Sequence, residues 1–378
     1  MRAYVYTDKS LERYAGRFVW LSLNTENAKN AAFLKKYPIP ALPTLLVLDA
    51  KRDSVALRYV GGANVSQVRK MLDDASSTYH SRAVSTADTA LTRGDKLAAA
   101  GEHADAIKAY EEALTAAPKA WPRYGRTAES MLFSMSMSDQ NERCASRALE
   151  LYPRVKGTVS AANVAATGLG CATSLEETHA QRNAWITALE AETREVLKNP
   201  KIELSGDDRS GLYMSLIDAR DAMKDDEGSM QLKNEWLSSL EASAKSAKTN
   251  EQRAVYDSHR LSAYIELGMA EKAIPMLEQS ERDFPDDYNP PARLALAYNA
   301  MKQYDKALAA SDRAVAKVYG PRKLSVLSTR ADIQLAKGDK EAARATIQQA
   351  IDYAKSLPEG QRSDRRIAQF EKRLAALD

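Results

Sequence analysis

The stretch that decides the fold is GDKLAAAGEHADAIKAYEEALTAAP, residues 94–118. Alanine and leucine dominate it at helical spacing, and Gly101 interrupts the pattern. Gly94 and Ala106 are small where two antiparallel helices would cross, because a larger side chain there would force the helices apart. Pro118 ends the second helix, since proline has no backbone N–H to donate. We therefore expect a helical hairpin here.

The spacing of the small and aromatic residues in this stretch closely resembles that of the tetratricopeptide repeat. The matching residues, at successive offsets of 7, 5, 4, 3 and 5, are Gly94, Gly101, Ala106, Tyr110, Ala113 and Pro118. In such a repeat, the small side chain of Ala113 lets the second helix approach the next hairpin. The resemblance implies an α-solenoid of stacked helix pairs, which is suited to holding another protein or a peptide.

The same pattern recurs further along the chain. Residues 148–153 (ALELYP) repeat the ending of the first unit 35 residues later. The three later occurrences are marked by Gly268, Ala273 and Pro285, by Tyr298, Tyr304, Ala307 and Ala314, and by Gly338, Ala343 and Ala350. We therefore predict repeats over 82–155 and 251–360. A capping helix with a solvated outer face is expected over 361–378.

Between residues 156 and 250 the helical period persists while the repeat signature fades. The apolar residues expected to form the core there are Trp185, Leu189, Val196, Leu212, Leu216, Trp236 and Leu240. We interpret 156–250 as degenerate helical hairpins of the same solenoid. A separate small helical domain is the alternative interpretation.

Residues 1–76 mix strand and helix signals. Apolar residues alternate with polar or aromatic ones over 19–23, as in a strand, and 44–49 is an apolar run typical of a strand buried on both faces. The other expected elements are a helix over 28–37, a turn over 50–53, a strand over 55–60 and a closing helix over 65–74. The polar stretch 73–77 is the expected boundary, unless one helix runs across it.

Three parts of this region resemble a thioredoxin. They are FVWLSLN at 18–24, IPALPTLLVLD at 39–49 and YVGG at 59–62. Asn24 stands where that family usually has an aspartate. The resemblance implies a cis peptide bond before Pro43, with Leu42 presenting its backbone N–H and C=O to an extended substrate. Leu42 and Pro43 are therefore the predicted substrate-binding residues, and the alternative is that Pro43 only sets the turn geometry.

The thioredoxin resemblance also implies what this sequence lacks. In that family a Cys-X-X-Cys motif begins a helix whose dipole lowers a thiol pKa. By the resemblance, that helix is already running at residues 1–4, so the motif and the strand before it have no residues here. The fold class predicted is thus mostly α, a tetratricopeptide-like α-solenoid with a partial thioredoxin-like α/β domain over 1–76.

The missing strand would be central in a thioredoxin sheet, between 18–23 and 44–49. Without it, backbone groups lose partners at a cost of about 1–3 kcal/mol each if they are buried. We therefore expect the natural protein to start upstream of Met1, and a stop codon close before Met1 would contradict this. Unpaired strand edges also favour self-association.

The sequence has only two cysteines, Cys144 and Cys171, which is too few for a disulfide scaffold or a cysteine zinc cluster. They fall on helices of adjacent predicted hairpins, so a disulfide between them is geometrically allowed. The alternative is that they are two small buried hydrophobic residues. The four histidines are scattered without metal-ligand spacing, so no metal and no cofactor are expected.

The first helix of each repeat lines the inner face of such a solenoid. In the best C-terminal unit this face would present Asn289, Arg293, Leu296 and Asn299, and in its neighbours Ser258, Ser262, Ser328 and Asp332. We predict Asn289, Arg293 and Asn299 as partner-binding residues. A Lys/Asn clamp for a C-terminal carboxylate is not assembled at these positions. The alternative is a solvated inner face without a fixed ligand.

Composition excludes several classes of partner. A net charge of +3 over 378 residues gives no electrostatic footprint for nucleic acid. The longest apolar run is far shorter than the roughly 18 residues that a membrane span needs. The first residues do not resemble a signal peptide, so the compartment stays open, and the periplasm is allowed if the natural start lies upstream.

These observations predict a protein-interaction module that binds a protein or peptide through its repeats and is redox-inactive as given. The alternative is a thiol–disulfide oxidoreductase of the thioredoxin family whose cysteines lie upstream, with the repeats recruiting substrate. A purely structural scaffold is the third reading.

Overall fold

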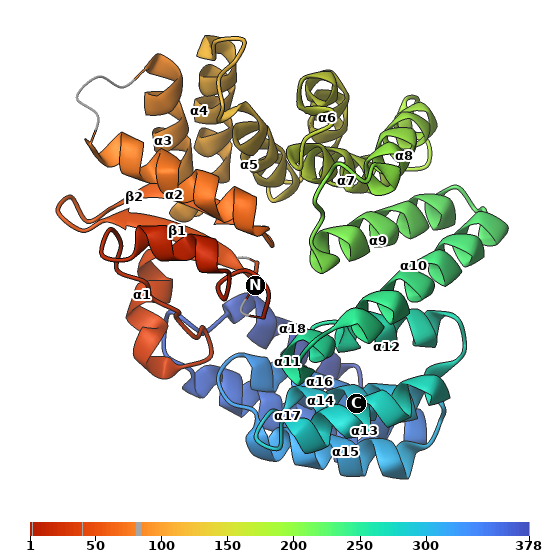
Figure 1. Ribbon diagram of the computed structural model, residues 1–378. Coiled ribbons are helices and arrows are strands. Elements are labelled where there is room, and N and C mark those ends of the chain that lie inside the picture. The colour runs from red at the N-terminus through yellow and green to blue at the C-terminus, as the bar shows by residue number, and fades with distance from the viewer. Residues whose placement is uncertain (2, 40, 81–84, 378) are drawn as a thin grey trace. The chain divides into compact units, whose positions relative to one another are not determined.

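The computed structural model describes residues 1, 3–39, 41–80 and 85–377, and helices dominate it (Figure 1). The chain divides into two compact units. Unit 1 comprises residues 1–17 and 39–236, and unit 2 comprises residues 18–38 and 237–378. The division between Trp236 and Leu237 falls inside one helix, α10.

Unit 1 contains a short sheet followed by helices. Its elements are the 3-10 helix η1 (Lys9–Tyr14), strands β1 (Thr44–Asp49) and β2 (Ser54–Val60), and helices α2 (Val65–His80), α3 (Thr86–Ala99), α4 (His103–Ala116), α5 (Tyr124–Ser136), α6 (Asn141–Val155), α7 (Ser160–Thr173), α8 (Arg182–Lys198), α9 (Gly206–Ala222) and the first half of α10 (Asp226–Ser246). Consecutive helices from α3 to α8 pack as antiparallel pairs.

Every regular element among the described residues of unit 2 is a helix. Its elements are the rest of α10, the 3-10 helix η2 (Ala28–Asn30), α1 (Ala31–Lys36), α11 (Asn250–Ala254), α12 (Asp257–Glu266), the 3-10 helix η3 (Ala270–Ala273), α13 (Ile274–Asp283), α14 (Asn289–Ala300), α15 (Tyr304–Lys317), α16 (Arg322–Lys337), α17 (Lys340–Ser356) and α18 (Asp364–Ala375). The prediction of a mostly α fold built from helix pairs is confirmed.

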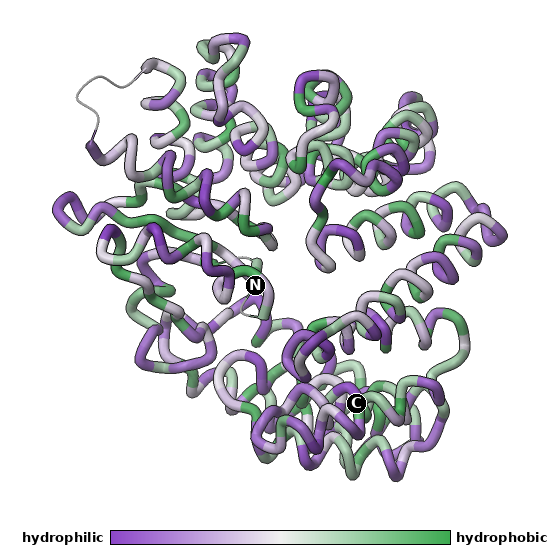
Figure 2. Tube along the Cα trace, in the orientation of Figure 1, coloured by the Kyte–Doolittle hydropathy of each residue, from purple (hydrophilic) through white to green (hydrophobic). Residues whose placement is uncertain are grey.

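The pairs in unit 1 are α3/α4, α5/α6 and α7/α8. Those in unit 2 are α14/α15, α16/α17, and α12 with η3, which continues into α13. We call the first helix of each pair its A helix and the second its B helix; α9, which packs on α7 and α8, follows as the next A helix. The surface formed by the A helices is called the A face. Figure 2 shows hydrophobic residues recurring between hydrophilic ones along these helices.

The first hairpin, α3/α4, has the structure that the sequence of residues 94–118 predicts. A Cβ at Gly94 of α3 would lie 2.6 Å from the ring of Tyr110 on α4, so the ring packs directly against the glycine backbone. Ala106 and Ala113 are fully buried, and Gly101 makes the turn between the two helices with φ of +82°. The small residues therefore mark the helix crossing, and this prediction is confirmed.

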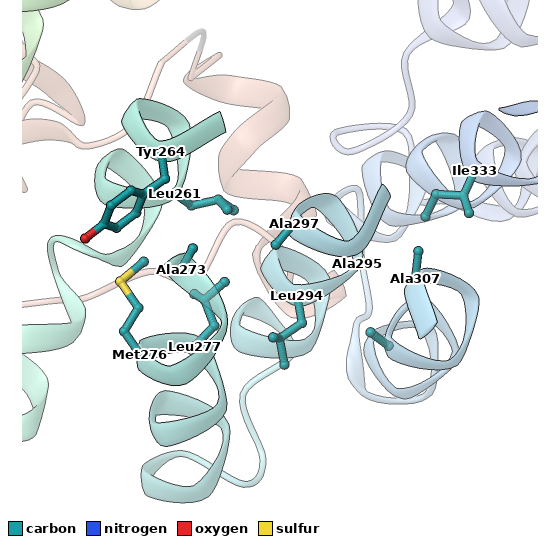
Figure 3. Packing of buried hydrophobic residues seen from close by; sticks show 11 residues of the cluster. Leu261, Tyr264, Ala273, Met276, Leu277, Leu294, Ala295, Ala297, Ala307 and Ile333 are labelled. Atoms are coloured by element: carbon teal, nitrogen blue, oxygen red, sulfur yellow. The ribbon is translucent and has the colours of Figure 1, made fainter. Parts of the chain in front are cut away.

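The hairpins from α12 to α15 share one apolar core that reaches Ile333 of α16 (Figure 3), and α16, α17 and α18 form a second apolar cluster. Leu261 of α12, Leu277 of α13 and Leu294 of α14 are each at most 3% exposed. Ala273 and Ala307, which occupy the same place in successive repeats, are fully buried at the contacts between hairpins. Burying such a leucine contributes about 1.5–3 kcal/mol, so this core holds neighbouring repeats together.

The sheet of unit 1 has two antiparallel strands, with Thr44 paired to Val60 and Leu46 to Arg58. The Leu42–Pro43 peptide bond just before β1 is cis. The helix expected over 28–37 and the strands expected over 44–49 and 55–60 are present, while α2 runs across 73–77 as far as His80.

The strand expected over 18–23 is wrong, because those residues form no regular element. Val19 and Leu21 are 87% and 76% exposed, so the alternating pattern is not satisfied by a neighbouring strand. The described residues form only the two-stranded sheet here, and the thioredoxin-like domain implied by the resemblance is not shown. Of its quoted residues, Arg2 and Pro40 lie outside the described part of the chain, as does the predicted repeat start at 82.

Residues 1–76 do not stay together in one compact unit. Residues 18–38 belong to unit 2, whereas the sequence on both sides of them belongs to unit 1. The chain therefore leaves unit 1 after Arg17 and returns to it at Ile39.

Two features are absent from the described residues. None of their helices is long and apolar enough to cross a membrane. No group of three His, Cys, Asp or Glu side chains among them is placed to share a metal ion.

Candidate partner-binding faces

The A face of unit 1 is covered by strand β2. The outer backbone edge of this strand meets side chains from two A helices. The Arg58 backbone N–H donates to Asp95 Oδ2 of α3 at 3.2 Å, and Arg126 Nη1 of α5 donates to the Arg58 carbonyl oxygen at 3.4 Å. Backbone groups that would otherwise be an open strand edge are thus satisfied by the repeat helices.

Asp95 is the centre of this contact. It is fully buried, and Arg126 Nη1 donates to its Oδ2 at 2.7 Å while the Tyr110 hydroxyl donates to its Oδ1 at 3.0 Å. Burial, together with the Asp95 charge, raises the pKa of Tyr110 well above its usual value, so the hydroxyl stays a donor. A buried carboxylate with three donors, one of them charged, fixes β2 against α3 and α5.

A second polar cluster continues the contact along β2. Asn163 Nδ2 of α7 donates to the Tyr59 hydroxyl oxygen at 3.2 Å and to Glu129 Oε2 of α5 at 2.8 Å. Burial raises the pKa of Glu129, which is only 8% exposed. Strand β2 therefore crosses three successive A helices in the way that a bound extended segment would, and it fills this part of the A face.

The A face of unit 2 carries the predicted partner-binding residues on α14. Arg293 is half-buried, and it donates no hydrogen bond to any residue that the structure describes. Burial lowers the pKa of Arg293, while the negative charges of Asp257 and Asp287 oppose that shift. Arg293 is thus a partly desolvated cation whose hydrogen-bonding capacity is unused.

Asp257, on the neighbouring A helix α12, carries a negative charge that acts on Arg293. It is fully buried, its Oδ2 accepts from Ser280 Oγ at 2.5 Å, and its Oδ1 has no hydrogen-bond partner among the described residues. Burial raises the pKa of Asp257, and Arg293 and Arg260 counteract this. Arg260 itself is held by two hydrogen bonds to Glu241, at 2.8 and 2.9 Å.

The other predicted residues of α14 differ in their hydrogen-bond partners and in their exposure. Asn289 is engaged locally, because its N–H and its Nδ2 both donate to Asp287 Oδ1, at 2.8 and 2.7 Å. Asn299 has a buried Oδ1 without a partner among the described residues. Leu296 is 41% exposed, a high value for a large apolar side chain. Arg293 and Leu296 thus offer a cation and an apolar contact on one helix, whereas the Asn299 Oδ1 is buried.

The predicted inner-face residues are exposed on α12 and hydrogen-bonded to α18 on α16. Ser258 and Ser262 of α12 are exposed. On α16, Arg373 of α18 donates to Ser328 Oγ at 2.7 Å and to Asp332 Oδ1 at 2.6 Å. The A face of α16 is therefore covered by the last helix, and the open part of this face lies on α12 and α14.

Cys144 of α6 and Cys171 of α7 are joined by a disulfide, with their Cα atoms 6.0 Å apart. The sequence left this open, and the structure resolves it in favour of the bond. Both residues are at most 2% exposed, so the bond lies inside the helix packing and not at an open redox site.

Leu42 and Pro43 lie immediately before β1. Leu42 is 56% exposed, and the Pro43 carbonyl accepts from the Gly61 N–H at 2.9 Å. The Pro43 carbonyl is thus used within the hairpin, and the role of these two residues in substrate binding stays a prediction.

An open depression of 540 Å³ lies beside Trp185, at the start of α6. Its two arginines are already paired. Arg143 Nη2 donates to Glu111 Oε1 at 2.6 Å, and Arg147 is bonded to Glu150. Arg147 Nε is buried there without a hydrogen-bond partner among the described residues.

Comparison with known proteins agrees with the helical pairs. A family model described as tetratricopeptide repeat matches residues 324–356, which identifies the α16/α17 pair as such a repeat. No curated protein matches the sequence.

Solved structures give only distant likenesses. A tetratricopeptide repeat protein from Parabacteroides merdae is 12% identical, with 77% of this chain and 99% of that chain covered at a TM-score of 0.46. A STAND protein with a tetratricopeptide repeat sensor from Pyrococcus horikoshii is 12% identical, with 94% and 60% covered at 0.43. The TPR2AB domain of yeast Sti1, in its complex with pHSP90, is 16% identical, with 76% and 98% covered at 0.29. At these scores the likenesses support no statement about function.

Proposed function

We propose that the chain is a protein-interaction module that binds an extended segment of a partner on the A face of unit 2. Tetratricopeptide repeats stack into surfaces that suit such segments, and the matched repeat lies in this unit. The equivalent face of unit 1 is already covered by β2, which leaves α12 and α14 as the open part.

The observation that carries the proposal is Arg293. A half-buried guanidinium without a hydrogen-bonded partner among the described residues has lost hydration without receiving a full replacement. A carboxylate on the partner would supply that replacement with a charge-assisted hydrogen bond. The partner segment proposed therefore carries an acidic residue for Arg293 and an apolar residue for Leu296.

The proposal is tested by selecting linear peptides from a random display library against the full chain. Enriched peptides are expected to carry a carboxylate. Their affinity should fall by at least about tenfold with either Arg293→Gln or Leu296→Asp, which corresponds to about 1.4 kcal/mol. Met214→Asp is the matched control, because Met214 is 44% exposed on α9 of unit 1. Equal affinity for all variants would contradict the proposal.

The oxidoreductase alternative rests on the sequence resemblance alone. The two cysteines of the sequence are bonded to each other and buried, which supports the interaction reading. We expect no insulin reduction by this chain, and sustained turnover would overturn the leading proposal.

A further inference from the structure

Residues 24–35 lie against two loops of unit 2 that hold equivalent places in successive repeats. We call these loops, residues 319–322 and 357–361, the loop edge. Asn24 Nδ2 donates to the Tyr319 hydroxyl oxygen at 2.8 Å, and Gln361 Nε2 donates to the Thr25 carbonyl oxygen at 2.7 Å. The bonded residues are 295 and 336 positions apart in the chain.

Glu26 supplies the strongest polar contact of this interface. Its Oε2 accepts from the Arg322 backbone N–H at 2.5 Å, at the first turn of α16. Pro321, the residue before that helix, gives it no side-chain cap. A carboxylate at a helix N-terminus satisfies a free N–H and interacts favourably with the helix dipole. The segment thus provides the cap that α16 lacks.

Two glycines of the loop edge permit the close approach. A Cβ at Gly320 would lie 2.2 Å from the Glu26 carbonyl oxygen, and a Cβ at Gly360 would lie 1.9 Å from the Ala31 carbonyl oxygen. Gly320 also has a positive φ of +62°, whereas Gly360 does not have a left-handed backbone. At Gly360, therefore, only the approach of the segment requires glycine.

The path of the chain makes this segment exchangeable. Residues 18–38 are an excursion between two stretches of unit 1, so the segment within them, residues 24–35, can be delivered to another copy without threading. The flank before it exposes Val19 and Leu21, at 87% and 76%. Two copies of this β-prone flank, related by a twofold axis, could pair as antiparallel strands and cover these side chains.

We propose that residues 24–35 of one copy occupy the loop edge of a second copy, so that the chain dimerises by exchanging this segment. The occupant is the second copy because every contact made within one chain is available, unchanged, between two. The extended flank, with its exposed apolar side chains, is the hinge that opens. This inference is independent of the partner site on α14.

The test uses two variants of the full chain with different masses, Lys35→Cys and Glu359→Cys, joined by a short bismaleimide cross-linker. Lys35 Nζ and Glu359 Oε2 are 2.8 Å apart and both side chains are largely exposed. The native cysteines are buried and bonded, so they do not compete. Exchange predicts a covalent heterodimer in the mixture, with a yield that rises with concentration.

The matched control is the pair Lys337→Cys and Asp305→Cys, which joins α15 and α16 inside the rigid repeats. That mixture should give at least tenfold less heterodimer. The double variant Lys35→Cys/Glu359→Cys reports docking within one chain. Cross-linking in the double variant without a heterodimer in the mixture would overturn the exchange, and no cross-linking in either would overturn the docking itself.

Discussion

Replacing Asp95 with alanine should release β2 from the A face of unit 1. Asp95 is fully buried and Arg126 is 12% exposed, so the variant leaves a buried guanidinium without its counterion. Removing one partner of a buried ion pair costs about 3–5 kcal/mol. The variant also removes the acceptor for the Tyr110 hydroxyl and the Arg58 N–H, and this lowers the stability further. We therefore expect unit 1 to lose at least about 3 kcal/mol of stability.

This loss is measured by urea unfolding that is monitored by hydrogen exchange of the β2 amides. Asp105→Ala is the control in the same hairpin, because Asp105 is 60% exposed and forms a surface ion pair with Lys108. A surface pair of this kind contributes about 0–1 kcal/mol. The double variant Asp95→Leu/Arg126→Met should recover part of the loss, since it removes both charges. A cost for Asp95→Ala equal to that of Asp105→Ala would refute the role assigned to Asp95.

The remaining predictions concern the core, the disulfide and pH. Leu277→Ala should destabilise unit 2 by about 2–5 kcal/mol, against less than about 1 kcal/mol for the exposed Leu296→Ala, as measured by chemical denaturation. Reducing the Cys144–Cys171 bond, which spans 27 residues, should lower the stability of unit 1 by about 3 kcal/mol, measured with and without reductant. Burial raises the pKa of Glu192 to about 7, so the folded state holds a proton that the unfolded state has released, and stability should fall as pH rises from about 4.5 to 7. Because this side chain is only half-buried, solvent screening should keep the effect to about 1 kcal/mol or less, and Glu192→Gln should abolish it in melting curves across that range.

The repeat architecture is predictable because its signal is local. Gly94, Ala106 and Ala113 are small for a reason that operates within one hairpin, and the same spacing returns in later hairpins. The expected strand over 18–23 failed for the opposite reason. Alternation of apolar and polar residues predicts that a segment can form a strand. The strand forms only if a neighbouring strand pairs with it, and the sequence of the segment alone does not show whether that neighbour exists.

The contacts that define the two faces depend on residues far apart in sequence. Asp95 meets the Arg58 backbone, 37 positions away, and nothing periodic links them. The available signal was a charged residue next to the glycine of a helix crossing, where a side chain must be buried and therefore paired. The docking of Glu26 on α16 has no such signal, because the Gly-Pro pair at 320–321 before this helix predicts only a turn.

Hydrogen exchange of the full chain, with and without a peptide selected from the display library, tests the central claim most directly. The account predicts that bound peptide slows exchange in α12 and α14, while β2 and the A helices beneath it are unchanged. Slower exchange confined to α3, α5 and α7, or displacement of β2 by the peptide, would place the binding face in unit 1 and contradict the account.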